Sequence, residues 1–166
     1  AFIPGTGRVI FDGSSAQAIN GSTQTNFNNV QINNTGTGVD LSTQNLNING
    51  TGAGALDFQN GKINTGALAV VMSGSAATIT NAGAGKYVNG YLKMAVPTGT
   101  PTRLFEIGDA TTYSPVNIVF NNVTVAGSVT INTVAGDYPN IITSLVDETR
   151  SVNRYWDIVN NGITVT

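Results

Sequence analysis

The fold is indicated by an eight-residue pattern that occurs three times in the first half of the chain: Phe27–Asn34 (FNNVQINN), Thr43–Gly50 (TQNLNING) and Phe58–Thr65 (FQNGKINT). Apolar and polar residues alternate in these segments, which is the pattern of a short, half-buried β-strand. The segments follow one another at a nearly constant spacing, and glycine-rich turns separate them. A short strand repeated at a fixed spacing is typical of a β-solenoid or of a serial β-meander.

Two features favour the solenoid over the meander. Asparagine recurs at matching places in the repeats, and stacked asparagine side chains form hydrogen-bonded ladders when strands are parallel and in register. No proline occurs from Gly5 to Val96, as expected where every rung needs its backbone N–H groups for the next rung. The sequence therefore predicts an all-β fold that begins as a parallel β-helix-like solenoid. Its coil is longer than the repeat spacing if one coil contains two or three such strands.

The sequence changes character near residue 96. Four of the five prolines and nine of the sixteen charged residues lie beyond it, and Val96–Pro101 reads as a turn-rich connector. We expect a solenoid over residues 1–96, closed by a polar capping strand at Tyr87–Met94, and a β-sandwich-like module over residues 97–166. The last predicted strand, Gly162–Thr166, runs to the final residue, so the module is expected to be truncated or to take partner strands from elsewhere.

Charge and hydropathy exclude several classes of partner. The chain has 7 Lys and Arg against 9 Asp and Glu, a net charge of −2. Such a balance provides no basic surface for nucleic acid or for an anionic membrane. No apolar run approaches the roughly 18 residues of a membrane-spanning helix. We therefore expect neither nucleic-acid binding nor membrane insertion.

Catalytic chemistry has few candidate residues. The chain contains no His and no Cys, so the commonest general base and thiolate nucleophile are both missing. The acids of the solenoid part, Asp12, Asp40 and Asp57, fall at different positions of the repeat, so the repeat pairs no two of them. We predict a protein that is not an enzyme, with no catalytic residue and no cofactor-binding residue.

Calcium is the metal alternative that stays open, because oxygen-ligand sites are common in secreted β proteins. Acidic residues are sparse, however, and no Asp-x-Asp repeat occurs. The pairs Gly108-Asp109 and Gly136-Asp137 are more typical of turns. No metal ligand is therefore assigned.

Aromatic side chains provide a weak set of candidate interaction residues: Tyr87, Tyr91, Tyr155 and Trp156. Rings of this kind form platforms for sugars. The alternative interpretation is that Trp156 anchors the core of the second module and that the tyrosines cap the solenoid.

Segments on both sides of the connector resemble modules of very large, repetitive cell-surface proteins of the Bacteroidota. The segments are Gly7–Ile19, Phe27–Asn34, Gly108–Val116, Asp137–Ile141 and Ser151–Trp156, the last of which reads SVNRYW. The resemblance implies an extracellular, adhesin-like protein that is exported by the type IX secretion route. It also implies a β-helix segment followed by an immunoglobulin-like module, and it assigns no catalytic residue.

The function expected from these features is structural: a spacer or stalk module of a surface adhesin or extracellular fibre. Its partners would be neighbouring modules of the same protein or other copies of itself. One alternative is a self-assembling filament subunit that adds a strand to its neighbour through Gly162–Thr166 or Ala1–Pro4. The other alternative is a carbohydrate-binding module that binds surface glycans.

Overall fold

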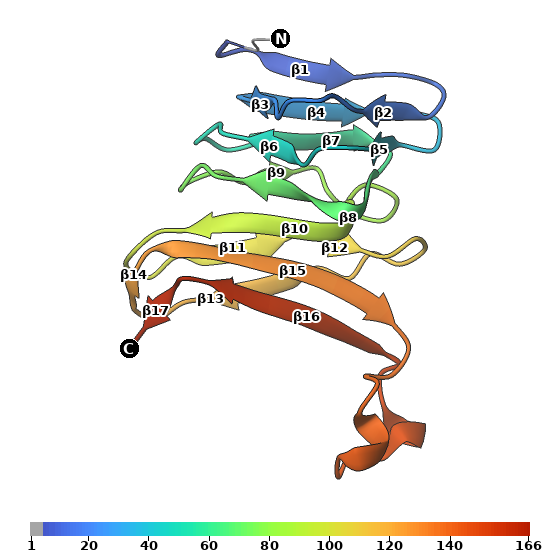
Figure 1. Cartoon of the computed structure of the whole chain (residues 1–166), viewed down its shortest axis with the longest axis vertical. Coiled ribbons are helices and arrows are strands. Elements are labelled where there is room, and N and C mark those ends of the chain that lie inside the picture. Colours follow the sequence, from blue (N-terminus) through green and yellow to red (C-terminus); the bar gives the residue numbers. More distant parts are fainter. Residues whose placement is uncertain (1–4) are drawn as a thin grey trace.

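The computed structural model describes residues 5–166, and it confirms an all-β solenoid of about five turns (Figure 1). The segment Ala1–Pro4 lies outside the described residues. The strands are β1 (Arg8–Phe11), β2 (Gln17–Ile19), β3 (Asn26–Phe27), β4 (Asn29–Asn33), β5 (Val39–Leu41), β6 (Leu46–Ile48), β7 (Leu56–Asn60), β8 (Ile63–Met72), β9 (Ile79–Thr80), β10 (Val88–Val96), β11 (Thr102–Phe105), β12 (Ile107–Gly108), β13 (Val116–Val119), β14 (Val123–Val125), β15 (Gly127–Ala135), β16 (Arg154–Asn161) and β17 (Thr164–Val165).

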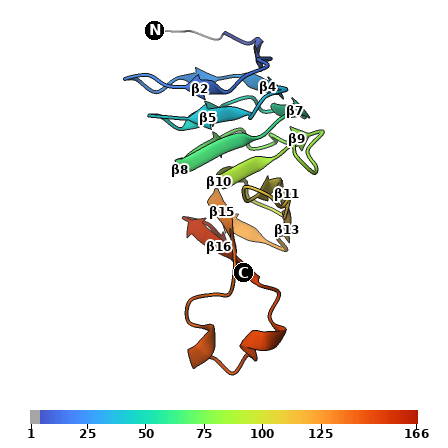
Figure 2. The ribbon, with the colours of Figure 1, turned by 90° about the vertical axis from the view of Figure 1, so that its right-hand side faces the viewer.

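Two sheets run along the long axis of the molecule and form opposite faces of the solenoid (Figure 2). The smaller sheet has the order β1-β4-β7-β9, and all of its pairings are parallel. The larger sheet has nine strands with the main order β16-β15-β10-β8-β5-β2, and β3 and β6 extend its face beside β8. Each coil of the chain therefore contributes a strand to one face and one or two short strands to the other.

The coil is longer than the sequence repeat. On the smaller sheet Arg8 pairs with Asn29, Val30 with Leu56 and Leu56 with Ile79, and each of these offsets exceeds the spacing of the repeated segments. The repeat spacing is therefore not the coil length, because one coil holds strands on both faces. Neighbouring copies of the sequence pattern consequently fall on different sheets, β4 on the smaller one and β6 on the larger one.

Asparagine ladders join the rungs, as the solenoid prediction requires. The side-chain amide of Asn47 donates to Asn26, that of Asn60 to Asn33, and that of Asn89 to Asn64. Each ladder links residues on paired strands that lie 21, 27 and 25 positions apart along the chain. The ladders thus follow the true coil and not the apparent repeat.

Alternation of apolar and polar residues places one continuous core between the two faces. In β4 the side chains of Val30 and Ile32 are fully buried, whereas Gln31 between them points outward. The same alternation in later strands extends a single cluster of buried apolar residues from Phe27 to Ile163. The core therefore continues through the region of the predicted connector.

Strand pairing changes from parallel to antiparallel at β10. This strand pairs in parallel with β8 and β12 and antiparallel with β15, and β15 pairs antiparallel with β16. The Tyr87–Met94 segment is therefore not a terminal cap, because it begins a strand with partners on both edges. Facing these strands, β11 and β13 form an antiparallel pair of their own, so this end has two layers (Figure 2). The division into units 1–96 and 97–166 stays a prediction.

The final strand has a partner within its own chain. Thr164 and Val165 of β17 pair antiparallel with β14, and Thr166 N–H donates to the Asn122 carbonyl oxygen. The Asn122 side-chain amide donates in return to the Thr166 hydroxyl at 2.6 Å. The Gly162–Thr166 segment thus pairs within the chain along one edge, and strand addition to a neighbour through this segment stays a prediction.

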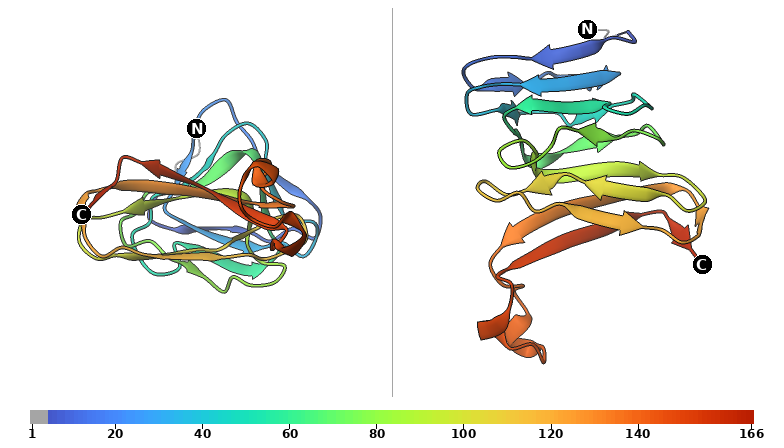
Figure 3. Two further views of the ribbon diagram at one scale, coloured as in Figure 1. Left: turned by 90° about the horizontal axis from the view of Figure 1, so that it is seen from below. Right: turned by 180° about the vertical axis from the view of Figure 1, so that it is seen from behind.

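A long loop hangs from the end of the solenoid between β15 and β16 (Figure 3). It contains two short 3-10 helices, η1 (Ile141–Thr143) and η2 (Glu148–Arg150). Several of its apolar side chains are exposed, including Ile142 and Leu145. The loop therefore adds little to the core.

Glycines at one corner allow successive turns of the chain to approach closely. A Cβ atom on Gly50 would collide with the Asn28 carbonyl oxygen, and one on Gly74 would collide with the Gly50 carbonyl oxygen. These three residues lie on three successive coils. The corner can stack only if no side chain enters it.

This corner gives a test of the stacking. Gly74→Ala is expected to lower the free energy of unfolding by about 2 kcal/mol, because the backbone must shift to relieve the overlap. Gly52→Ala is the matched control, since a Cβ there meets nothing within 4 Å, and a change of less than about 0.5 kcal/mol is expected. Urea unfolding followed by circular dichroism measures both. Equal stability of the two variants would contradict the corner packing.

Candidate functional site

A buried carboxylate on the outside of the smaller sheet ties four rungs together. Asp57 lies in β7 between the core residues Leu56 and Phe58, points away from the core, and is only 5% exposed. Side chains from β1, β4, β7 and the β9 region donate to it. The donors are Gln31 Nε2 (2.6 Å), Asn81 Nδ2 (2.7 Å), Gln59 Nε2 (3.0 Å), Thr80 Oγ1 (3.0 Å) and Arg8 Nη1 (3.5 Å).

The hydrogen bonds decide the charge state of this carboxylate. Burial alone would raise the pKa of Asp57, but the bonds from Gln31, Asn81, Gln59 and Thr80 outweigh it and lower the pKa to about 2. A carboxylate with this many donors is stabilised in its ionised form. We interpret the Asp57 cluster as a structural clamp, because its donors leave no open position for a ligand.

A second ion pair joins the segments Gly108–Val116 and Ser151–Trp156. Arg154 Nη2 lies 2.6 Å from Asp109 Oδ2, and Arg154 Nη1 donates to the Thr133 hydroxyl. The other Asp109 oxygen accepts the backbone N–H groups of Thr111 and Thr112. Burial raises the pKa of the Asp109 carboxyl, but these bonds and Arg154 hold it well below its usual range. Asp109 thus fixes its own loop, as the turn interpretation predicts, and anchors β16 to it.

Tyr87 belongs to this buried network and not to a surface platform. It is 1% exposed, its hydroxyl donates to the Asp109 carbonyl oxygen, and its ring packs on Tyr113 at 5.6 Å. Tyr113 in turn donates to the Glu106 carboxylate, and burial and Glu106 together raise the pKa of Tyr113. Because Tyr87 is enclosed, it is unavailable as a contact for a sugar.

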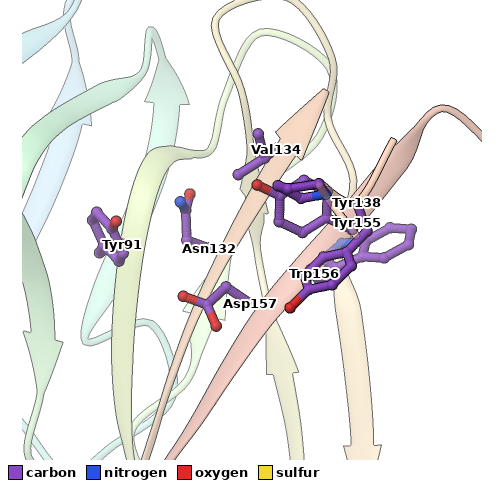
Figure 4. Close-up of a pocket in the computed structure, with 8 residues that line it drawn as sticks. Tyr91, Asn132, Val134, Tyr138, Tyr155, Trp156 and Asp157 are labelled. Atoms are coloured by element: carbon purple, nitrogen blue, oxygen red, sulfur yellow. The ribbon is translucent and has the colours of Figure 1, made fainter. Parts of the chain in front are cut away.

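Tyr91 and Tyr155 lie at one pocket of about 340 Å³ on the outside of β10, β15 and β16 (Figure 4). Trp156 also borders this pocket, but its indole lies on the opposite face of β16, because it pairs with the buried Thr133 whereas Tyr155 pairs with Val134. The lining residues of the pocket are Tyr91, Asn132, Val134, Tyr138, Pro139, Tyr155, Trp156 and Asp157. We call this site the aromatic pocket.

The orientation of the aromatic rings in and beside the pocket is set by neighbours. Tyr138 packs edge-to-face against Tyr155, with ring centroids 5.3 Å apart and planes at 88°. The Trp156 indole N–H donates to the Ser114 carbonyl oxygen at 3.2 Å. Trp156 is 38% exposed, so it does not serve as the fully buried core anchor considered from the sequence.

Polar side chains line the other part of the pocket. Asn132 pairs with Asp157 across β15 and β16, and Leu92 pairs with Ile131, which puts Tyr91 across from Asn132. The three polar side chains therefore form a row over three adjacent strands (Figure 4).

Sequence reasoning did not identify Asn132, Tyr138 or Asp157. Tyr138 falls in the Asp137–Ile141 segment already singled out for its resemblance, so this tyrosine could have been proposed as a candidate from the sequence. Asn132 and Asp157 are separated along the chain by the whole loop between β15 and β16, and only the antiparallel register of these strands brings them together.

Metal and membrane features are limited in the part of the chain that the structure describes. Within residues 5–166 no group of three or more acidic side chains gathers where it could hold a metal ion. The calcium alternative stays a prediction. None of the same residues forms a helix of the length and hydropathy needed to cross a membrane.

Comparison with protein-family models, with curated proteins and with solved structures finds no match to this chain. Function must therefore be argued from the geometry of the clamps and the pocket.

The Asp57 clamp predicts a specific loss of stability in acid. Because the folded-state pKa of about 2 lies below the ordinary 3.8, the contribution of Asp57 to the free energy of unfolding is complete above about pH 5. It is lost as the pH falls toward 2. Between pH 5 and pH 2 the free energy of unfolding of the wild-type chain should fall by about 2 kcal/mol more than that of the Asp57→Asn variant. Urea unfolding across this pH range measures the difference. Asp12→Asn, at an exposed position, is the control, and parallel curves for wild type and Asp57→Asn would contradict the clamp.

The Arg154–Asp109 pair predicts a strong dependence on Arg154. Arg154→Met should lower the free energy of unfolding by about 3 kcal/mol, because it leaves a largely buried carboxylate without its cation. Arg150→Met is the matched control: the Arg150 side chain is 86% exposed and pairs only loosely with Asp147, so less than about 0.5 kcal/mol is expected. Similar losses in the two variants, measured in urea, would argue against the anchoring role.

Proposed function

We propose that this chain is a spacer module of an extracellular adhesin or fibre. The observation that supports the proposal is the course of the chain, which starts at β1 at one end of the long axis and ends at β17 on the far side of the stacked strands, with only the loop between β15 and β16 extending further (Figure 1). A module with this course adds length when copies or other modules are joined in series. Its partners are then neighbouring modules of the same protein.

The internal bonding supports a load-bearing role. Backbone hydrogen bonds link each rung to the next along both sheets, and the Asp57 clamp adds side-chain bonds across four of them. A force along the axis is therefore opposed by many bonds at every level. Nearest-neighbour stacking of this kind gives stability that grows with the number of rungs.

The proposed location is the cell surface, reached by the type IX route. Support comes from the segments that resemble surface modules of the Bacteroidota, since Gly108–Val116 and Ser151–Trp156 bond to each other through Asp109–Arg154 and Ser114–Trp156. Antibody labelling of intact cells that produce the protein checks this location, and labelling only after lysis would contradict it.

A filament subunit is the second candidate. Both ends of the larger sheet, β16 and β2, have a free edge within the described residues, and Ile158 and Val159 of β16 are about half exposed. Free edges at opposite ends allow copies to join head to tail. In this arrangement β16 accepts the neighbouring strand.

The two candidates differ in solution. For a spacer, small-angle X-ray scattering of proteins with one, two and three copies in tandem should show a maximum dimension that rises by a constant step. The single copy should stay monomeric at every concentration. A filament would instead give polymers of the single copy that grow with concentration, and Val159→Lys on the β16 edge should abolish them. Tandem proteins that fold back into compact particles would overturn the spacer.

A further inference from the structure

We infer that the aromatic pocket binds a neutral saccharide, which adds a recognition site to a module otherwise proposed as a spacer. The pocket collects three of the five tyrosines of the chain. The remaining tyrosines, Tyr87 and Tyr113, pack on each other in the Asp109 network. The tyrosines that are not enclosed are thus gathered at one place on the surface.

The polar groups of the pocket have no partners within residues 5–166. The side chains of Asn132 and Asp157 make no hydrogen bond or ion pair there, and neither do the hydroxyls of Tyr91, Tyr138 and Tyr155. Other amides and acids are bonded within the chain, as the Asn64–Asn89 ladder and the Asp57 clamp illustrate. The unpaired groups of the pocket leave hydrogen-bonding capacity for a ligand.

A sugar ring has the two kinds of surface that this arrangement complements. Its C–H face packs on an aromatic ring, and its hydroxyls donate to a carboxylate and exchange bonds with an amide. The Tyr138–Tyr155 contact holds these two rings in place before binding. Such preorganisation reduces the entropy lost when a ligand binds.

The charge of the pocket selects among sugars. Asp157 is its only carboxylate, and no lysine or arginine is among its lining residues. A uronic or sialic acid would bring its negative charge beside Asp157 without a cation to offset it. The site is thus expected to bind neutral hexose units and to reject acidic ones.

The size of the pocket limits the ligand and its affinity. A volume of about 340 Å³ lies at the small end of the roughly 300–1,000 Å³ of ligand pockets. It suits one or two sugar units of a longer glycan. We expect a dissociation constant of about 1 mM for a single site, which repetition of modules in one protein would strengthen through avidity.

Saturation-transfer NMR tests the inference. The probes are β-1,4-linked tetrasaccharides of glucose, mannose and galactose, with tetragalacturonate as the acidic comparison. At least one neutral probe should give a saturable signal with the folded chain, and tetragalacturonate should give none. No signal from any neutral probe, or a stronger one from the acidic probe, overturns the proposal.

Variants locate the site. Tyr138→Ala should weaken binding about three- to tenfold, since it removes one stacking ring, and Asp157→Asn should change the ranking of the probes. Ile142→Ala, at a 75% exposed position in the same loop, is the matched control and should bind as the wild type does. Circular dichroism confirms that each variant is folded. Binding that survives Tyr138→Ala and Asp157→Asn unchanged overturns the assignment, whereas the spacer proposal is judged separately by scattering.

Discussion

The backbone hydrogen bond from one rung to the next is the interaction on which this structure depends. Each strand of the smaller sheet pairs in register with the strands above and below it, from β1 through β9. A rung can stack in this way only if every backbone donor is free and no side chain intrudes at the corners. The lack of proline over Gly5–Val96 and the small residues at Gly50 and Gly74 both follow from that requirement.

The stacking also explains why a chain with so few charges is rich in asparagine. An amide both donates and accepts, so a column of amides can continue through any number of rungs. A carboxylate only accepts, so it must end a column or be surrounded by donors. Asp40 ends such a column: it accepts a hydrogen bond from Asn64, which in turn accepts one from Asn89. Asp57 is instead surrounded by donors.

The sequence was sufficient to predict the solenoid, because alternation and proline avoidance are local properties of each strand. It was insufficient for the coil length, since the similar segments at Phe27–Asn34 and Thr43–Gly50 occupy different sheets and the true offset varies between coils. The interaction residues were partly predictable. Tyr91 and Tyr155 do line one pocket, whereas the Trp156 indole lies on the other face of β16 and Tyr87 is enclosed by a network that depends on contacts between distant segments.

The position of the aromatic pocket follows from the change in strand direction at β10. In the parallel rungs similar residues stack on one another, so amides meet amides and their hydrogen bonds are satisfied within the column. An antiparallel partner reverses the order of residues, so that unlike side chains lie opposite each other. Asn132 and Asp157 are such a pair. Polar groups placed in this way are not paired by the repeat, and the loop between β15 and β16 brings Tyr138 beside them. A solenoid that must present a distinctive surface can therefore do so most readily where its regular stacking ends.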